Sequence, residues 1–147
     1  MATSRKFAVA VHILTLMAWA EDEPLKSEAV ADSVNTNPVV IRRIMCALAR
    51  AGLVTSQTGA AGGSRLSRKP PNISLLDIHR AVENGNAFLL HNNPNQHCPV
   101  GMGMEAVLES VLRDVNLAME NALSRVTVAE VLSRVRTCKK RGKRLSR

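Results

Sequence analysis

The chain has 147 residues and a net charge of +8, with 46% hydrophobic but only 2% aromatic residues. This length suits one compact domain, or a small domain with a long appended helix. Proteins that bind single strands stack the bases on aromatic side chains, and this chain has too few of them to form such a platform. The composition therefore favours duplex DNA as the nucleic acid. The three aromatic residues are Phe7, Trp19 and Phe88.

The positive charge is concentrated in two segments. Residues 136–147 hold seven basic side chains and no acidic one, which leaves a net charge of only +1 on the other 135 residues. Between Thr36 and Lys69 there is again no acidic residue, and guanidinium groups there suit phosphates and guanine edges. The alternative is a solvated basic face on an ordinary helical pair. The basic residues of this second segment are Arg42, Arg43, Arg50, Arg65, Arg68 and Lys69.

Residues 3–20 predict a first helix that is apolar almost all round, so we expect it to be buried on two sides. The segment also imitates a signal peptide, since Arg5 and Lys6 precede an apolar run that ends in an A-x-A pattern. His12 and Thr15 interrupt that run, and it is too short to span a bilayer. We therefore expect the helix to belong to the folded protein.

Residues 27–50 predict a helix-turn-helix. A short helix at 27–34 is followed by a turn, and then Asn37 can cap a helix in which Pro38 holds the first position. Spacing places four apolar residues of this second helix on a buried face, namely Ile41, Ile44, Met45 and Leu48. The opposite face carries Val39, Arg42, Arg43, Cys46 and Arg50.

Residues 53–67 predict a β-wing. Strands at 53–57 and 64–67 flank a loop with three glycines, which can turn sharply and approach a phosphate or the minor groove. Gly62, Gly63 and Arg65 are the expected contacts. The alternative is a flexible hairpin tip with no role in binding.

The second half of the chain predicts helices. Capping boxes open helices at Ser74 and Thr127, and a long amphipathic helix spans about 100–125. The fold class is therefore mainly α with a small β-wing: a winged helix-turn-helix at 1–84, a sensing loop at 85–99, dimerisation helices at 100–136 and a disordered basic tail at 137–147. Two interpretations of the tail are equally compatible with its composition: a solubilising extension and a DNA-binding arm.

These segments, in this order, resemble the bacterial Rrf-two family of winged-helix transcription regulators. The resemblance rests on the Ser4-Arg5-Lys6-Phe7 helix start, the segment LARAGLVTSQTGAAGGSRLS, the helix at Ser74 and the final helix at Thr127. It covers residues 2–135, and its most specific part is the glycine-rich wing after a helix ending in AGLV. It implies a homodimer through residues 100–125 and the first helix, with each recognition helix in a major groove and the wing at 59–65 in the minor groove.

The sensing loop departs from the family pattern. Cluster-binding members carry three cysteines spaced by six, and the matching positions here are Asn92, Cys98 and Met104. Since asparagine and methionine are poor ligands for iron in place of thiolates, we expect no iron–sulfur cluster and no other cofactor. A mixed-ligand metal site remains open as an alternative, with His12, His91, His97 and Cys98 as candidates, whereas His12 is better explained as a satisfied core histidine.

Cys98 has a further candidate role. Because it precedes Pro99 at the expected start of the long helix, a thiolate there would be stabilised and reactive, with His97 beside it. Cys98 is therefore a candidate redox or electrophile sensor, and the alternative is an inert thiol.

The sequence thus predicts a duplex-DNA-binding regulator in the cytoplasm, a homodimeric repressor whose affinity responds to a redox or small-molecule signal. Base readout is assigned to Arg42 and Arg43, and phosphate contacts to Arg5, Arg65, Thr36 and Asn37. The remaining candidate contacts are Val39, Cys46, Arg50, Gly62 and Gly63. Two other classes stay open: a thiol-dependent enzyme built on Cys98 and His97, and a protein-interaction module that does not bind DNA.

Overall fold

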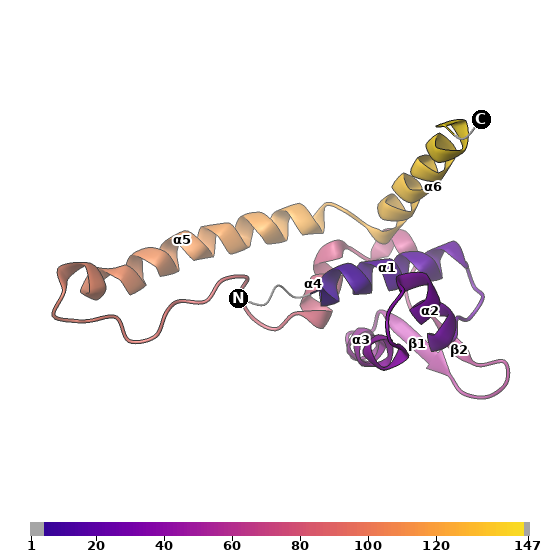
Figure 1. Ribbon diagram of the computed structural model, residues 1–147, viewed down its shortest axis with the longest axis horizontal. Coiled ribbons are helices and arrows are strands. Elements are labelled where there is room, and N and C mark those ends of the chain that lie inside the picture. The colour runs from indigo at the N-terminus through magenta and orange to yellow at the C-terminus, as the bar shows by residue number, and fades with distance from the viewer. Residues whose placement is uncertain (1–4, 146–147) are drawn as a thin grey trace.

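The computed structural model describes residues 5–145, and the side chains as far as Gly142. Over this range the chain is mainly helical with one small antiparallel sheet, which confirms the predicted fold class (Figure 1). The elements in order are α1 (Lys6–Trp19), α2 (Ser27–Val34), α3 (Pro38–Arg50), β1 (Val54–Gln57), β2 (Gly63–Leu66), η1 (Pro70–Asn72), α4 (Leu75–Val82), α5 (Pro99–Ser124) and α6 (Val128–Leu145).

The turn between α2 and α3 has the predicted chemistry. Asn35 ends α2 in the left-handed conformation, at φ 58°, which asparagine tolerates better than most residues. Asn37 then caps α3, because its Oδ1 accepts a hydrogen bond of 2.8 Å from the amide of Val39. Pro38 occupies the first turn, where its missing N–H costs nothing.

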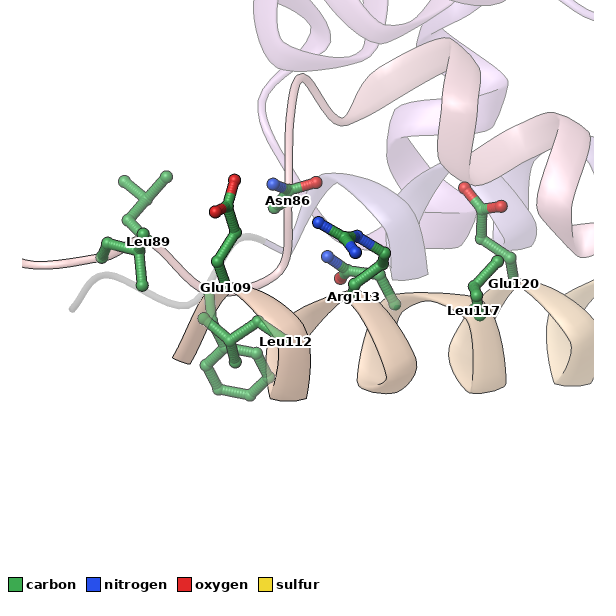
Figure 2. A pocket seen from close by; sticks show the side chains of 10 residues that line it. Asn86, Leu89, Glu109, Leu112, Arg113, Leu117 and Glu120 are labelled. Carbon is green, nitrogen blue, oxygen red and sulfur yellow. The ribbon is translucent and has the colours of Figure 1, made fainter. Parts of the chain in front are cut away.

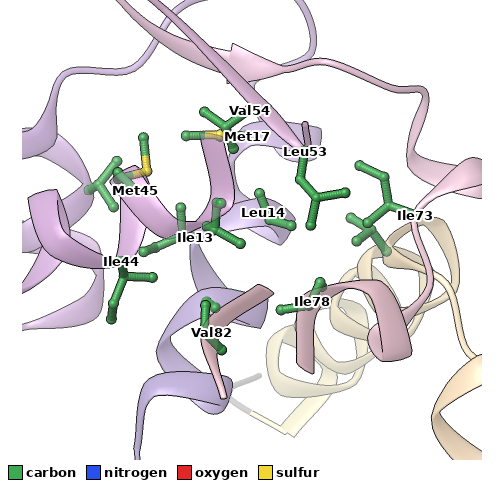
Figure 3. Packing of buried hydrophobic residues seen from close by; sticks show 14 of the residues in the cluster. Ile13, Leu14, Met17, Ile44, Met45, Leu53, Val54, Ile73, Ile78 and Val82 are labelled. Carbon is green, nitrogen blue, oxygen red and sulfur yellow. The ribbon is translucent and has the colours of Figure 1, made fainter. Parts of the chain in front are cut away.

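The core lies where α1, α3 and α4 meet the first residues of the wing (Figure 3). Ile13 and Leu14 of α1 are fully buried, and so are Leu48 of α3 and Ile78 of α4. All four apolar residues predicted for the inner face of α3 are buried. Helix α3 is therefore held on one side only, and its other face stays free.

The wing is a two-stranded hairpin whose base is attached to the segment before α2. Leu25 exchanges two backbone hydrogen bonds with Ser64, of 2.9 and 2.8 Å. The side chains of Ser56 and Ser64 are also hydrogen-bonded across the hairpin at 2.8 Å. These bonds fix the direction of the wing relative to the helix-turn-helix.

The first turns of α6 belong to the winged-helix body. Val128 and Leu132 are buried in the core, and the amide of Val128 donates to the carbonyl of Ile73 at 2.9 Å. The sequence grouped α6 with the dimerisation helices, but a helix this tightly joined to η1 and α1 is part of the body. Helix α5 projects from this body and buries none of its residues (Figure 1).

The expectation of a disordered tail from residue 137 is wrong as far as residue 145, because α6 continues to Leu145. Residues 146 and 147 lie outside the described residues. Lysine, arginine and leucine favour helix, which explains why a basic segment here prolongs α6. Arg136 and Lys139 also lie over the ring of Trp19, at 5.5 and 4.9 Å from its centroid, and join α6 to α1.

The expectation of a core histidine at position 12 is also wrong. His12 is exposed on α1, where its Nε2 lies 3.0 Å from Ser33 Oγ of α2. A helix that is apolar almost all round does not by itself reveal which side faces the core. None of the helices in residues 5–145 combines the length and hydropathy needed to cross a membrane.

Candidate DNA-binding surface and sensing loop

The outer face of α3 presents the residues that the sequence proposed for DNA contact. Val39 is 49% exposed, and Arg42, Arg43, Cys46 and Arg50 are exposed as well. They stand on the side opposite the buried Ile41 and Leu48, as the helical spacing predicted. This face is thus shaped like a recognition surface, with guanidinium groups and no neighbouring apolar cover.

One of these arginines has a partner that the local sequence did not reveal. The guanidinium of Arg42 donates to Glu28 Oε1 of α2 at 3.1 Å, and both side chains are well exposed. Arg43 forms no ion pair with any residue that the structure describes. The two adjacent arginines are therefore not equivalent, and Arg43 is the more available of the two for a base or a phosphate.

The turn residues use some of their hydrogen-bonding groups internally. Thr36 is half-buried, and its amide donates to the carbonyl of Ala31 at 3.1 Å. The Oδ1 of Asn37 is engaged by its cap. Arg5 is the exposed residue before α1, and its carbonyl accepts from the amide of Val9 at 3.0 Å. The side chains of Arg5 and Thr36 remain candidates for phosphate contact.

The wing glycines are placed differently from one another. Gly62 is buried, its amide donates to Gly59, and an added Cβ would clash with the carbonyl of Gln57. Gly63 has φ 152° and would bring a Cβ within 3.0 Å of Pro24. These two glycines therefore shape the loop, while the exposed tip belongs to residues 59–61.

Arg65 lies beside this loop on β2. Its guanidinium donates to Gln57 Oε1 at 3.2 Å across the hairpin. That contact holds a positive charge at the edge of the wing, on an element whose base is fixed to the body. Arg65 thus remains the wing residue best suited to a phosphate.

Cys98 is the residue before α5, as the sequence predicted. The nearby backbone N–H of Gly101, followed by that of Val100, lowers the pKa of the Cys98 thiol, whereas desolvation acts in the opposite direction. Gly101 has a second role, because an added Cβ there would clash with the carbonyl of Asn95. The loop can therefore fold over the start of α5 only because residue 101 is glycine.

The proposed metal candidates are not brought together. Among the described residues, no group of three His, Cys, Asp or Glu side chains is placed to hold a metal ion. His12 bonds to Ser33, and the backbone of His97 is fixed by Asn95 Oδ1 at 2.9 Å, with its side chain exposed. His91 is exposed on the loop.

An apolar groove between α1 and α6 was not foreseen. It has a volume of about 470 Å³ and is lined mainly by Val11, Leu16 and Trp19 of α1 and by Val131 and Val135 of α6. The sequence signal was the apolar second side of α1, which was expected to meet another surface. Its position beside the basic half of α6 depended on the tertiary structure.

Comparison with known proteins finds relatives that are transcriptional regulators. A family model described as Rrf2, an iron-dependent transcriptional regulator, matches residues 3–134. The chain is 43% identical over 129 residues to YwnA of Bacillus subtilis, which carries the name of an HTH-type transcriptional regulator, and the match covers 87% of this chain and 95% of YwnA.

Solved structures agree. A crystal structure described as that of a DNA-binding protein is similar with a TM-score of 0.71 at 40% identity, over 86% of this chain and 98% of that one. IscR of T. potens is similar with a TM-score of 0.70 at 25% identity, over 92% and 88% of the two chains. CymR, the global cysteine regulator of B. subtilis, has a TM-score of 0.68 at 24% identity over 90% and 97%, a likeness of fold.

Proposed function

This chain belongs to the Rrf2 family of DNA-binding transcriptional regulators, and we propose that it is a homodimeric repressor whose DNA affinity responds to a chemical signal. The single observation that carries the DNA-binding part is the outer face of α3. It presents Arg42, Arg43 and Arg50 beside a wing that carries Arg65. Such a pairing suits a helix in the major groove and a wing beside it.

The dimer is supported by the surface of α5. This helix of 26 residues has no buried residue, and the valines of one side remain strongly exposed, at 63% for Val100, 61% for Val107 and 51% for Val111. Water-exposed apolar stripes of this length mark interaction surfaces. A second copy of α5 supplies a matching stripe, and two-fold symmetry would place two recognition helices on one duplex.

The groove between α1 and α6 supports the same proposal. Leu16, Trp19 and Val135 offer an apolar surface on the winged-helix body. In a dimer whose long helices run antiparallel, the far end of the partner's helix returns to this body and can cover the groove. The first helix would then be part of the interface, as proposed from the sequence.

The signal is proposed to reach the protein through Cys98. The lowered pKa of its thiol increases the thiolate fraction near neutral pH, and thiolates are the species that oxidants and electrophiles attack. Cys98 lies at the hinge between the loop and α5, so a bulky or charged adduct there would disturb the helix start. We place this activity in the cytoplasm, where the three cysteines, all free in this structure, would be kept reduced.

Two alternatives are less well supported. A thiol-dependent enzyme needs a base within hydrogen-bonding reach of the nucleophile. No hydrogen bond joins the sulfur of Cys98 to the ring of His97, and the relatives are transcriptional regulators. An interaction module that does not bind DNA would not account for the exposed arginines on the outer face of α3.

The test is a titration of the purified dimer with duplex DNA from its own upstream region, in the reduced state and after peroxide. We expect tight binding that weakens with salt, is lost on oxidation and returns with thiol. In the reduced state, the Cys98→Ala variant should bind DNA like the wild type. Treatment with peroxide should leave its DNA affinity unchanged. A Cys46→Ala variant is the control, since Cys46 stands on the DNA face and could block binding directly. Failure to bind any upstream fragment would contradict the regulator.

A further inference from the structure

The last turns of α6 carry a basic segment, residues 136–142, that belongs to neither the recognition helix nor the wing. Leu132 is the last buried residue of α6, and every residue from Ser133 to Gly142 is exposed. The sequence has no acidic residue after Glu130. The family match ends at residue 134, so the basic segment lies beyond the part of the chain that the family model describes.

The positive charges of the basic segment are not neutralised within the described part of the chain. The carboxylate of Glu130 is engaged by Arg134, one turn further along α6. The cations that follow form no ion pair with any residue that the structure describes: Arg136, Lys139, Lys140 and Arg141. The first three are spaced by three and then one residue, so they share one side of the helix. This side of α6 is therefore a row of available cations.

Trp19 of α1 positions the beginning of this row. The guanidinium of Arg136 and the ammonium of Lys139 lie over its ring, at 5.5 and 4.9 Å from the ring centroid. Together with Lys140, these residues line a hollow of about 300 Å³. A cation over an aromatic face keeps its charge and can still donate from its other side. Positioned cations lose less side-chain entropy when they bind an anion.

The basic segment lies on the far side of the winged-helix body from the recognition helix. Figure 1 shows α6 leaving the body beside α1 and pointing away from α3 and the wing. Helix α1 packs against both α3 and α6 and thus stands between them. A straight duplex that lies along α3 is therefore out of reach of the basic end of α6.

The charged surface of α5 is different in kind. A groove of about 470 Å³ lies between α5 and the loop that follows α4, and Figure 2 shows Glu109, Arg113 and Glu120 rising from α5 beside it. Glu120 accepts from the guanidinium of Arg80 at 3.1 Å. Because carboxylates flank Arg113 on both sides, this surface has no preference for a polyanion. The basic segment of α6 has no such carboxylates.

We propose that the basic segment is a second binding surface for the phosphate backbone of duplex DNA. A duplex carries about one negative charge per 1.7 Å of its axis, and unpaired cations bind it by releasing counterions. A complex with an acidic protein would instead need an apolar centre. Val135 is the only aliphatic side chain between Ser133 and Gly142. Charges without an apolar surface favour a phosphate backbone over a protein.

With α3 on one side and the basic segment on the other, one molecule can hold two stretches of DNA. The second contact reads no sequence, because contacts to phosphates position a protein without identifying bases. Once α3 has bound an operator, the basic segment meets neighbouring DNA at a high local concentration. This joining of two stretches rests on the proposed DNA binding by α3, whereas the contact of α6 with DNA does not.

The first experiment uses Trp19 as a reporter. It is the only tryptophan of a chain without tyrosine, so the intrinsic fluorescence comes from the ring beneath Arg136 and Lys139. The full-length variant Arg42→Ala with Arg43→Ala, whose recognition helix is weakened, is titrated with a short duplex of random sequence. We expect a fluorescence change that saturates with duplex and is lost as the salt concentration rises. Unchanged fluorescence at low salt would contradict the proposal.

Further variants in the same background locate the surface. Lys140→Gln combined with Arg141→Gln should weaken duplex binding at least about tenfold at low salt and lower the salt dependence by about two released ions. Glutamine favours helix about as well as lysine and arginine, so the helix content should be unchanged by circular dichroism. The matched control is Lys140→Arg combined with Arg141→Lys, which keeps both charges and should bind normally. Normal binding by the glutamine variant would overturn the proposal.

Two measurements test other uses of these cations. Poly-L-glutamate at equal charge should displace the duplex poorly, because an extended peptide has a lower charge density than DNA. Displacement as efficient as that by unlabelled duplex would indicate a site for an acidic protein. Analytical ultracentrifugation should give the same mass for the glutamine variant and its parent. A lower mass would show that the cations hold the dimer together, and would overturn the proposal.

A last experiment separates this proposal from DNA binding by α3. Two duplexes of the upstream region, one with a donor dye and one with an acceptor, are mixed with the wild type. We expect energy transfer, which Lys140→Gln with Arg141→Gln should abolish while still binding the upstream DNA. A Trp19 response without sequence-specific binding would support the surface of α6 and contradict only the regulator. Sequence-specific binding without a Trp19 response would do the opposite.

Discussion

Arg42 of α3 and Glu28 of α2 form an exposed ion pair of 3.1 Å across the helix-turn-helix. This relationship places a carboxylate beside a surface whose own sequence segment contains none. Exposed ion pairs contribute at most about 1 kcal/mol to stability, so this pair is of little importance to the fold. Its consequence is for binding, because DNA must compete with Glu28 for the guanidinium of Arg42.

Replacing Glu28 with Gln should therefore strengthen DNA binding without stabilising the protein. The substitution removes a negative charge that repels phosphates and releases Arg42. We expect a several-fold gain on random duplexes in low salt and a melting temperature close to that of the wild type. Glu83→Gln, a carboxylate of the loop after α4, is the matched control. Weaker binding by Glu28→Gln would show that Glu28 holds Arg42 in its working position.

Arg42→Ala and Arg43→Ala should differ in their effects on specificity. If an arginine reads a base, its loss costs about 1–3 kcal/mol on the operator and much less on random DNA. If it contacts a phosphate, its loss weakens binding to both duplexes equally, and the salt dependence of binding falls by about one released ion. Since Arg43 lacks an ion-pair partner, we expect the larger loss of specificity from Arg43→Ala. Binding titrations with both duplexes at several salt concentrations measure this.

The thiol of Cys98 should be alkylated at lower pH in the folded protein than in urea. The backbone N–H groups that lower its pKa are held near the sulfur only when α5 is formed, so the thiolate persists to lower pH in the native state. The stabilisation that follows is present at alkaline pH and disappears as the pH falls through the native pKa. Peptide-level mass spectrometry of iodoacetamide labelling against pH reads out Cys98 alone.

Gly101→Ala should abolish that difference. Its Cβ would clash with the carbonyl of Asn95 and push the loop away from the start of α5. Gly103→Ala is the control, because a Cβ at that position meets no atom within 4 Å. If Gly101→Ala leaves the labelling profile unchanged, the loop does not shape the environment of the thiol.

Val111→Glu should convert the dimer to a monomer. It places a charge in the middle of the exposed valine stripe of α5, where burial against a second copy would leave it unpaired. Ser110→Glu adds the same charge next to the stripe and should stay dimeric. Analytical ultracentrifugation distinguishes the two, and a monomeric wild type would contradict the interface. A dimeric Val111→Glu would place that interface elsewhere.

Local patterns along the chain were enough to predict the helix-turn-helix and the wing. Asn37 and Pro38 start α3, four apolar residues at helical spacing bury one side of it, and Ser74 with Asp77 forms a true capping box at α4. These features depend on residues within a few positions of each other, where backbone sterics and side-chain caps act directly. The position of Cys98 at the start of α5 was predictable for the same reason.

What could not be predicted involves residues far apart in the chain. Glu28 reaches Arg42, Glu120 reaches Arg80, and Trp19 lies beneath Lys139 only because packing brings separate helices together. The exposure of His12 and the helical course of α6 as far as Leu145 were missed on similar grounds. Periodicity fixes which residues share a helix face, but the neighbours of that face follow from how the whole core packs. Local residues thus determined the recognition surface, and tertiary packing alone decided which of its charges are free and where a groove opens beside α5.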